Sequence, residues 1–302
     1  MNKRILYVLI AVVVIVSIIF ISGRLLRKEL DTDSDSSTAA HDINGDAVFP
    51  GRVPVPMPSG DLSVSTVVLL PDLYQAGKGF TCTGLAYDNT SDTFLAGEIG
   101  ALLPNEQVRS SIIRLSKDLS TVIETIPLYD VFSAMIDVQG ITFDTSDNTI
   151  WFCSHAENKI WNMSASGERL GSITTPQPTG VAYSGADDTF WVLSYDDKIR
   201  HIDKSGSVLQ TIPFSYNETL DQCLLDEDRG LLYITAGANY TSRNNVYCLN
   251  IDTQEQYIAC TVDSYAVEGI WLGDGNKMII LNDGYYHSAA AEKNQANIYT
   301  VH

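Results

Sequence analysis

The sequence predicts an all-β fold, a β-propeller of five antiparallel blades closed by a strand from the N-terminal side. Three observations support this prediction. A phrase recurs along the chain, with copies beginning at positions 84, 140, 180, 223 and 269. Short apolar strands alternate with turn residues, and no window of helical period competes with them. The last copy lacks a fourth strand, and one strand near the beginning of the chain is left over to supply it.

The repeated phrase is a glycine, an apolar residue, a small residue and an aromatic, then a polar turn and a second apolar strand. The clearest copies are GITFDTSDNTIWF at residues 140–152 and GVAYSGADDTFWV at 180–192. The copy at Cys223 has lost its glycine. Repeats of about 40 to 56 residues have the length of a four-stranded blade, with insertions in some copies. Six blades, with a copy hidden inside the long first repeat, are the alternative.

A third and a fourth strand follow the first two strands of the repeat. In the second copy they are residues 159–163 and 169–173, joined through Gly167, and in the third copy 199–202 and 208–212, joined through Gly206. Glycine at these tips supplies the positive φ of a tight hairpin.

The ring closure is also predicted. The fifth copy ends after its third strand at residues 297–301, while residues 64–70, followed by PDLY, resemble the outer strand 121–126, followed by PLYD. We therefore expect residues 64–70 to complete the last blade, which removes two open sheet edges.

Three regions are predicted: a membrane anchor with its flanks at 1–30, a linker at 31–60 and the propeller at 61–302. Residues 5–22 are uninterruptedly apolar, nearly enough to span a bilayer core, and no A-x-A-like cleavage site follows. An uncleaved signal-anchor is therefore favoured over a cleaved signal peptide. Flanking charges do not fix the orientation. From the architecture we expect a single-pass protein with its propeller outside the cytoplasm, in the cell envelope. The linker is acidic, then Pro-rich.

Composition and motifs restrict the function. The net charge of −18 makes nucleic acid an unlikely partner and is consistent with solubility or with affinity for cations. No nucleophile elbow, H-E-x-x-H or Walker loop occurs, and no C-x-x-C pair. Cys248 and Cys260 lie on strands that are expected to be neighbours. The two thiols either form a disulfide or are small buried core residues.

One candidate site is the ring of residues just before the repeated glycine, at the end of the central channel: Thr83, Gln139, Thr179, Gln222 and Glu268. Oxygen-bearing side chains with one carboxylate suit either a weak calcium site, with Glu268 and Gln139 as ligands, or a hydrated channel.

A second candidate set follows the second strands and is expected on one face: Glu98, His155, Asp196 and Asp283. These side chains suit ligand binding, metal binding or acid–base chemistry, but Asp is also an ordinary turn residue. The long segments 97–110 and 284–297 are candidates for recognition loops.

Together with the apolar run and the acidic linker, the phrases QGITFD, TGVAYSGADDTFWVLS and VEGIWLGDGN make the chain resemble the SdiA-regulated family. That resemblance implies a membrane segment, a five-bladed propeller distantly similar to NHL-repeat propellers, a calcium site in the propeller and no established activity. The Glu-Gly pair typical of such propellers is kept only at Glu268-Gly269. The other copies lack this glutamate, so the chain departs from the family pattern at the implied calcium site.

The sequence thus favours a membrane-anchored, non-enzymatic module that binds a small molecule, a glycan or a protein. The alternative is a metal-dependent hydrolase or lactonase of the NHL or phytase-like kind, based on the acids and histidine after the second strands.

Overall fold

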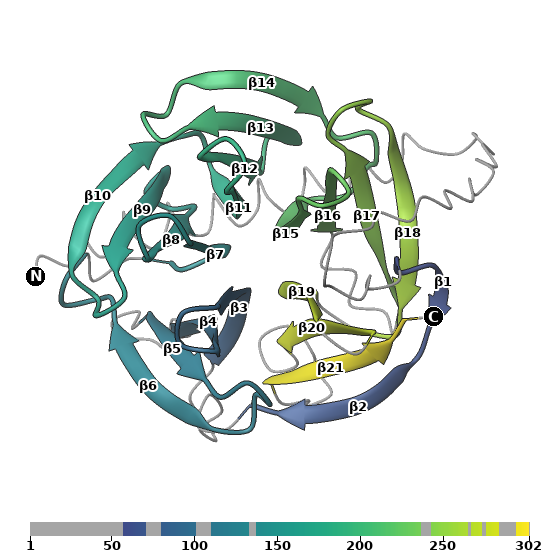
Figure 1. Ribbon diagram of the computed structural model, residues 1–302, viewed down its shortest axis with the longest axis horizontal. Helices are drawn as coiled ribbons and strands as arrows, with labels where there is room; N and C mark the ends of the chain where they lie inside the picture. The colour runs from purple at the N-terminus through teal and green to yellow at the C-terminus, as the bar shows by residue number, and fades with distance from the viewer. Residues whose placement is uncertain are drawn as a thin grey trace, which may run out of the picture. The chain divides into compact units, whose positions relative to one another are not determined.

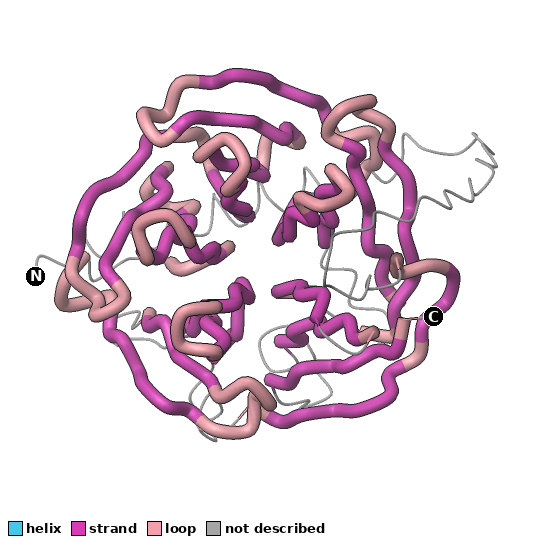
Figure 2. The backbone as a smooth tube through the Cα atoms, viewed as in Figure 1, coloured by secondary structure: helices cyan, strands magenta, loops and turns pink. Residues whose placement is uncertain are grey.

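The computed structural model describes residues 57–70, 80–100, 110–132, 137–236, 243–264, 267–273, 276–283 and 294–301. All regular secondary structure in these residues is β-strand, and the strands form five sheets around a central axis (Figure 1, Figure 2). The first strand of each repeat lies nearest the axis and the last lies at the rim (Figure 1). The predicted five-bladed, all-β propeller is confirmed, and the six-bladed alternative is wrong.

The blades follow one another along the chain. Blade 1 consists of β3 (Phe80–Asp88), β4 (Thr93–Gly100), β5 (Ser111–Leu115) and β6 (Val122–Pro127). Blade 2 consists of β7 (Ile141–Asp144), β8 (Thr149–Ser154), β9 (Lys159–Ser164) and β10 (Arg169–Thr174). Blade 3 consists of β11 (Pro178–Ser184), β12 (Thr189–Ser194), β13 (Lys198–Asp203) and β14 (Val208–Pro213). Blade 4 contains β15 (Leu220–Asp226), β16 (Leu231–Ala236), β17 (Asn244–Asn250) and β18 (Gln256–Val262). Blade 5 contains β19 (Gly269–Gly273), β20 (Lys277–Asp283) and β21 (Asn294–Thr300).

The ring is closed by β2 (Val64–Leu69), which pairs antiparallel with β21 as the outer strand of blade 5, as predicted. A second strand, β1 (Gly60–Leu62), was not predicted and pairs parallel with β18 at the rim of blade 4. The amide of Val64, the first residue of β2, donates to the Asp263 carboxylate at 2.9 Å. The segment 60–69 therefore holds two neighbouring blades together.

Residues in the left-handed backbone conformation, with positive φ, form the tight hairpin turns. Asn148 and Asp188, between the first and second strands of blades 2 and 3, have φ of 57° and 59°. Gly167 and Gly206, in the outer hairpins, have φ of 89° and 88°. Asn and Asp tolerate this conformation better than most residues, and glycine adopts it without steric cost. The turn assignments made from sequence are therefore correct.

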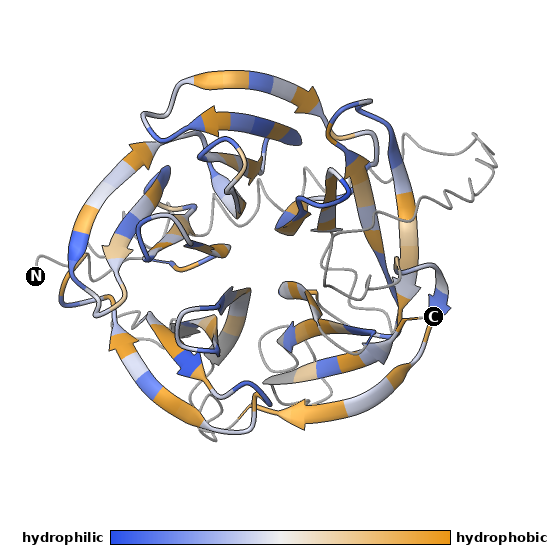
Figure 3. Ribbon diagram, viewed as in Figure 1, coloured by the Kyte–Doolittle hydropathy of each residue, from blue (hydrophilic) through white to orange (hydrophobic). Residues whose placement is uncertain are grey.

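The core lies between blades. Trp151 of blade 2 and Phe190 of blade 3 pack with ring centroids 4.7 Å apart in one of five apolar clusters. Burying such a side chain contributes about 1.5–3 kcal/mol. Along the outer strands β6, β10 and β14, hydrophobic and hydrophilic residues lie side by side (Figure 3), because only the face toward the ring is buried.

The five cysteines are buried, and none of them forms a disulfide. Cys248 lies opposite Tyr257, and Cys260 lies opposite Val246, so the two thiols do not pair across the β17–β18 ladder. Of the two alternatives left open by the sequence, the structure has the buried core residues.

Several sequence predictions lie outside the described residues: the anchor at 1–30, the linker up to residue 56, and most of the segments 97–110 and 284–297. Within the part of the chain that the structure describes, there is no helix with the length and hydrophobicity needed to cross a membrane.

Candidate functional site

The repeated glycine lies where the inner strands of neighbouring blades touch. The amide of Gly140 donates to the carbonyl of Thr179 at 2.6 Å, and that of Gly84 donates to the carbonyl of Glu268 at 2.5 Å. A Cβ on Gly140 would lie 2.6 Å from the Cα of Gly180, closer than such atoms approach. The glycine is thus required by packing around the axis, and this packing brings the preceding residues to one end of the channel.

We call that end, where the inner strands begin and the second strands finish, the mouth face. The opposite end, where the turns 89–92, 145–148, 185–188 and 227–230 join first to second strands, is the turn face. Because strands in each blade alternate in direction, every predicted site residue lies toward the mouth face.

The five channel-ring residues make different contacts. Thr83 is buried, and its hydroxyl donates to the carbonyl of Val138 at 2.8 Å, a link between blades 1 and 2. The hydroxyl of Thr179 is buried without a hydrogen-bond partner among the described residues. Glu268 is buried, and Gln139 is half-buried. The ring residues therefore carry one carboxylate, that of Glu268, and otherwise neutral oxygens.

Asp221 is a second carboxylate at this end of the channel, and sequence reasoning missed it. The Nε2 of Gln222 donates to its Oδ1 at 3.1 Å. Enclosure by protein raises the pKa of Asp221 to about 7, although part of its surface stays exposed. The fourth repeat lacks the glycine, and the β15–β16 ladder shifts register between Leu220 and Cys223. Counting along the repeat therefore identified Gln222 and not its neighbour.

Glu98 lies on β4, opposite Cys82 and Ser111 in the ladders on either side. Its side chain is buried, and no hydrogen bond or ion pair joins its carboxylate to the described residues. Burial raises the pKa of Glu98 to about 7. A desolvated carboxylate without a cationic partner is costly, and such groups concentrate at functional sites.

His155 lies in the β8–β9 turn, with its Nδ1 3.9 Å from Oδ2 of Asp137. Asp137 accepts hydrogen bonds from the Ser154 hydroxyl at 2.7 Å and the Ala156 amide at 3.1 Å. Burial raises the pKa of Asp137 and lowers that of His155. The ring of Tyr195 packs against the imidazole, with centroids 4.3 Å apart. Neither Asp137 nor Tyr195 was predicted, since both lie in connections that the repeat does not define.

The other two members of the second set differ. Asp196 is neutralised by a bidentate pair with Arg200 and by Lys198 at 3.3 Å. Burial opposes ionisation of Asp196, but the Arg200 hydrogen bonds outweigh it, and the pKa of Asp196 is lowered. Asp283 pairs with Asn294 in the β20–β21 ladder, and its side chain lies outside the described residues. No hydrogen bond or ion pair in the described part joins Glu98 or His155 to Asp196.

Calcium, which the family resemblance implies, prefers six to eight oxygen ligands including carboxylates. No group of three His, Cys, Asp or Glu side chains in the described ranges is placed to hold a metal ion. The mouth offers the Glu268 carboxylate, the unpartnered Thr179 hydroxyl and the Gln139 side chain. This donor set fits weak binding of a hard cation and does not fit a tight calcium site.

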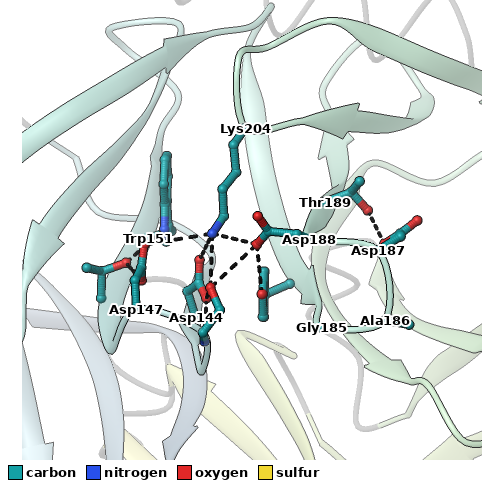
Figure 4. Close-up of polar contacts among 12 residues, drawn as sticks. Asp144, Asp147, Trp151, Gly185, Ala186, Asp187, Asp188, Thr189 and Lys204 are labelled. Atoms are coloured by element: carbon teal, nitrogen blue, oxygen red, sulfur yellow. Dashed lines mark hydrogen bonds and ion pairs between the residues drawn. The ribbon is translucent and has the colours of Figure 1, made fainter.

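Several buried or half-buried carboxylates on the turn face are paired with cations. Arg114 reaches Asp88 at 2.5 Å, and Lys204 reaches both Asp144 and Asp188 at 2.6 Å (Figure 4). The Lys204 hydrogen bond lowers the pKa of Asp188. Burial of Lys204 opposes its charge, but the two carboxylates raise its pKa.

Polar contacts also join turn to turn. The hydroxyl of Thr90 in blade 1 donates to Asn148 in blade 2 at 2.8 Å, and the Ala186 amide in blade 3 donates to Glu227 in blade 4 at 3.3 Å. The turn face is therefore a cross-linked structural surface, whereas the buried Glu98 toward the mouth face has no cationic partner among the described residues.

No family model matches the chain, and no curated protein does. Among solved structures, the glutaminyl cyclase of Myxococcus xanthus is similar, with a TM-score of 0.54, 10% identity and coverage of 81% of this chain and 98% of that chain. A luciferin-regenerating enzyme has a TM-score of 0.49, 12% identity and coverages of 78% and 95%. A gluconolactonase from Xanthomonas campestris has a TM-score of 0.43, 14% identity and coverages of 84% and 99%. At these identities the likeness shows the propeller fold alone, and membership of the SdiA-regulated family stays a prediction.

Proposed function

We propose that the chain is a membrane-anchored propeller of the cell envelope that binds a small cation at its mouth face without catalysis. One observation carries this proposal: the two faces differ in charge compensation. Asp88 and Asp144 on the turn face have basic partners, whereas Glu98 has none among the described residues, and the enclosed Asp221 accepts a hydrogen bond from the neutral Gln222 amide.

Physical chemistry explains why that asymmetry favours a cation. An enclosed carboxylate loses hydration and regains electrostatic stabilisation when a positive charge binds beside it. The net charge of −18 raises the local concentration of cations around the whole domain. The cation class includes calcium, held weakly with Glu268 and Gln139, and organic amines.

The decisive experiment is a thermal shift of fragment 57–302, which contains every described strand, with calcium, magnesium, spermidine or tetramethylammonium. A ligand at a hundredfold excess over its Kd stabilises the folded state by about 2.7 kcal/mol, which raises Tm by several degrees. We expect at least one cation to do so. Indifference of Tm to all four at millimolar concentration would overturn the proposal.

Variants locate the cation. Glu268→Gln removes the carboxylate of the channel ring and should abolish a calcium response. Glu98→Gln should weaken a response that depends on the buried acid of blade 1. Glu168→Gln, at an exposed hairpin, is the matched control and should respond as the wild type does.

The membrane part of the proposal is supported by the apolar run at residues 5–22. The full chain should sediment with membranes and resist extraction by salt, and fragment 57–302 should stay in the supernatant. Protease added to intact cells should degrade the propeller. A full chain that salt releases would contradict the anchor.

A second candidate, hydrolysis, is favoured by the placement of His155 beside Asp137. The Nδ1 of the imidazole lies 3.9 Å from the carboxylate, too far for a hydrogen bond, so Asp137 acts on His155 through its charge. The test is hydrolysis of a panel of lactones and aryl esters, with and without added calcium, by the wild type and by His155→Gln. Turnover that this substitution abolishes would favour the enzyme, and no turnover would exclude these substrates.

A further inference from the structure

Among the described residues, Gln177 is the one non-glycine residue with a positive φ that lies in a connection between blades. Nine non-glycine residues in the described ranges have positive φ, and all but Gln177 lie in hairpin turns within a blade. Gln177, with φ of 40°, lies in the connection from β10 to β11, between Pro176 and Pro178.

This conformation is unfavourable for a glutamine. Pro followed by a left-handed residue is the pattern of a type II turn, in which glycine or asparagine is usual at the second central position. A residue that precedes proline is in addition driven toward extended backbone. Strain of this kind persists where the surroundings hold it, and it concentrates at functional sites.

Two hairpins hold Gln177 in place. Its amide donates to Oδ1 of Asn158 at 2.9 Å, and its carbonyl accepts from the Tyr195 amide at 3.1 Å. The Thr175 amide donates to the Asn158 carbonyl at 3.0 Å. The amide of Asn158 in turn donates to the carbonyl of His155 at 3.2 Å. The exposed Gln177 is thus fixed between the turns that carry His155 and Tyr195.

Two aromatic side chains gather there, beside the Asp137 carboxylate. Tyr195 is 40% exposed, and the His155 ring packs against it at 63° between planes, which fixes both rings. The charge of the adjacent Asp196 is cancelled by Arg200. Burial lowers the pKa of His155, so its imidazole is neutral at pH 7.

We propose that Gln177, Tyr195 and His155 form a subsite for a neutral saccharide on the mouth face between blades 2 and 3. An exposed, fixed aromatic ring stacks on the C–H face of a sugar, and the glutamine amide and the imidazole nitrogen supply donors and acceptors for its hydroxyls. The rigid backbone lowers the entropy cost of weak binding. This inference is independent of the proposed cation site.

The test is calorimetry of the full chain, purified in a detergent without a sugar headgroup, against maltotriose, cellotriose, mannotriose and triacetylchitotriose. Sialyllactose is the acidic comparison. We expect at least one neutral oligosaccharide to bind. Tyr195→Ala should weaken it roughly tenfold, and Tyr195→Phe should retain it, because the ring carries the stacking.

A matched pair isolates Gln177. Gln254 is also an exposed glutamine with positive φ, 61°, but lies in the β17–β18 hairpin. Glycine at either position relieves strain, so Gln177→Gly and Gln254→Gly should both keep or raise Tm. Only Gln177→Gly should lose saccharide affinity, and its response to cations should stay unchanged. Equal affinity of the two variants, or no binding of any neutral oligosaccharide, would overturn the proposal.

Discussion

Lys204 and Asp144 belong to different blades, yet the lysine ammonium lies 2.6 Å from the carboxylate (Figure 4). Lys204 extends from the β13–β14 hairpin of blade 3, and Asp144 ends the inner strand of blade 2. The Asp144 side chain is fully buried, and Lys204 also reaches Asp188. This lysine therefore neutralises a buried acid that belongs to the neighbouring blade.

Lys204→Met should lower the free energy of unfolding by about 3 kcal/mol, because it leaves the buried Asp144 without its cation. Lys117→Met removes an exposed pair with Asp92 and should change stability by no more than about 0.5 kcal/mol. Urea denaturation of the two variants measures both. Equal stabilities would show that the inter-blade pair contributes nothing beyond a surface pair.

Gly140→Ala should destabilise the ring by at least about 2 kcal/mol, since its Cβ would lie within 2.7 Å of the Thr179 carbonyl. Gly171→Ala is the matched control, because a Cβ there meets nothing within 4 Å. Thermal unfolding should show a large drop in Tm for the first and almost none for the second. A Gly140→Ala variant with wild-type Tm would refute close inter-strand packing as the reason for the repeated glycine.

Truncation tests the closure of the ring. Fragment 57–302 should unfold cooperatively, and fragment 63–302, without β1, should have a lower Tm because it loses the pairing with β18. Fragment 76–302 lacks β2 as well and leaves β21 with an open edge, so it should not form a stable ring. Circular dichroism melting compares the three, and equal Tm values for the longest and shortest would disprove closure by β2.

The buried Glu98 should make stability depend on pH. Its folded pKa, about 7, lies above its ordinary value of 4.5. The folded state therefore binds the proton more tightly than the unfolded state, and the resulting stabilisation is present below pH 4.5 and is lost as the pH rises through 7. Glu98→Gln should remove this part of the pH dependence and stabilise the protein at pH 8 by up to about 3 kcal/mol. Denaturant titrations at pH 5 and pH 8 decide the matter, and an unchanged pH slope in the variant would contradict the assignment.

The fold followed from local patterns that tertiary structure did not override. The repeated strands around Trp151 and Trp191 fix blade length, and the unclaimed strand at 64–70 identifies the closure. β1 could not be predicted, because three residues carry no alternation and pair in parallel through a tertiary contact.

The candidate site was less accessible from sequence. Glu98 lies within β4 and is buried without a cation, whereas Asp196 lies in the turn after β12 and is neutralised by Arg200. The difference in their charge compensation depends on the side chains that neighbouring strands place beside each carboxylate. Asp137 lies outside the repeated phrase, so its approach to His155 appears only in three dimensions.

The closure of the ring by β2 also determines the order in which parts of the propeller can fold. Val64 is synthesised well before its partner Tyr299. Blades 1 to 3 contain only consecutive strands and can form as the chain emerges, whereas β2 must wait for β21. Pairing of such distant segments is slow, and during the delay the apolar Val67 and Leu69 remain on an unpaired strand edge. The last folding event therefore joins the two ends of the domain, and until it occurs the nascent chain carries an aggregation-prone strand.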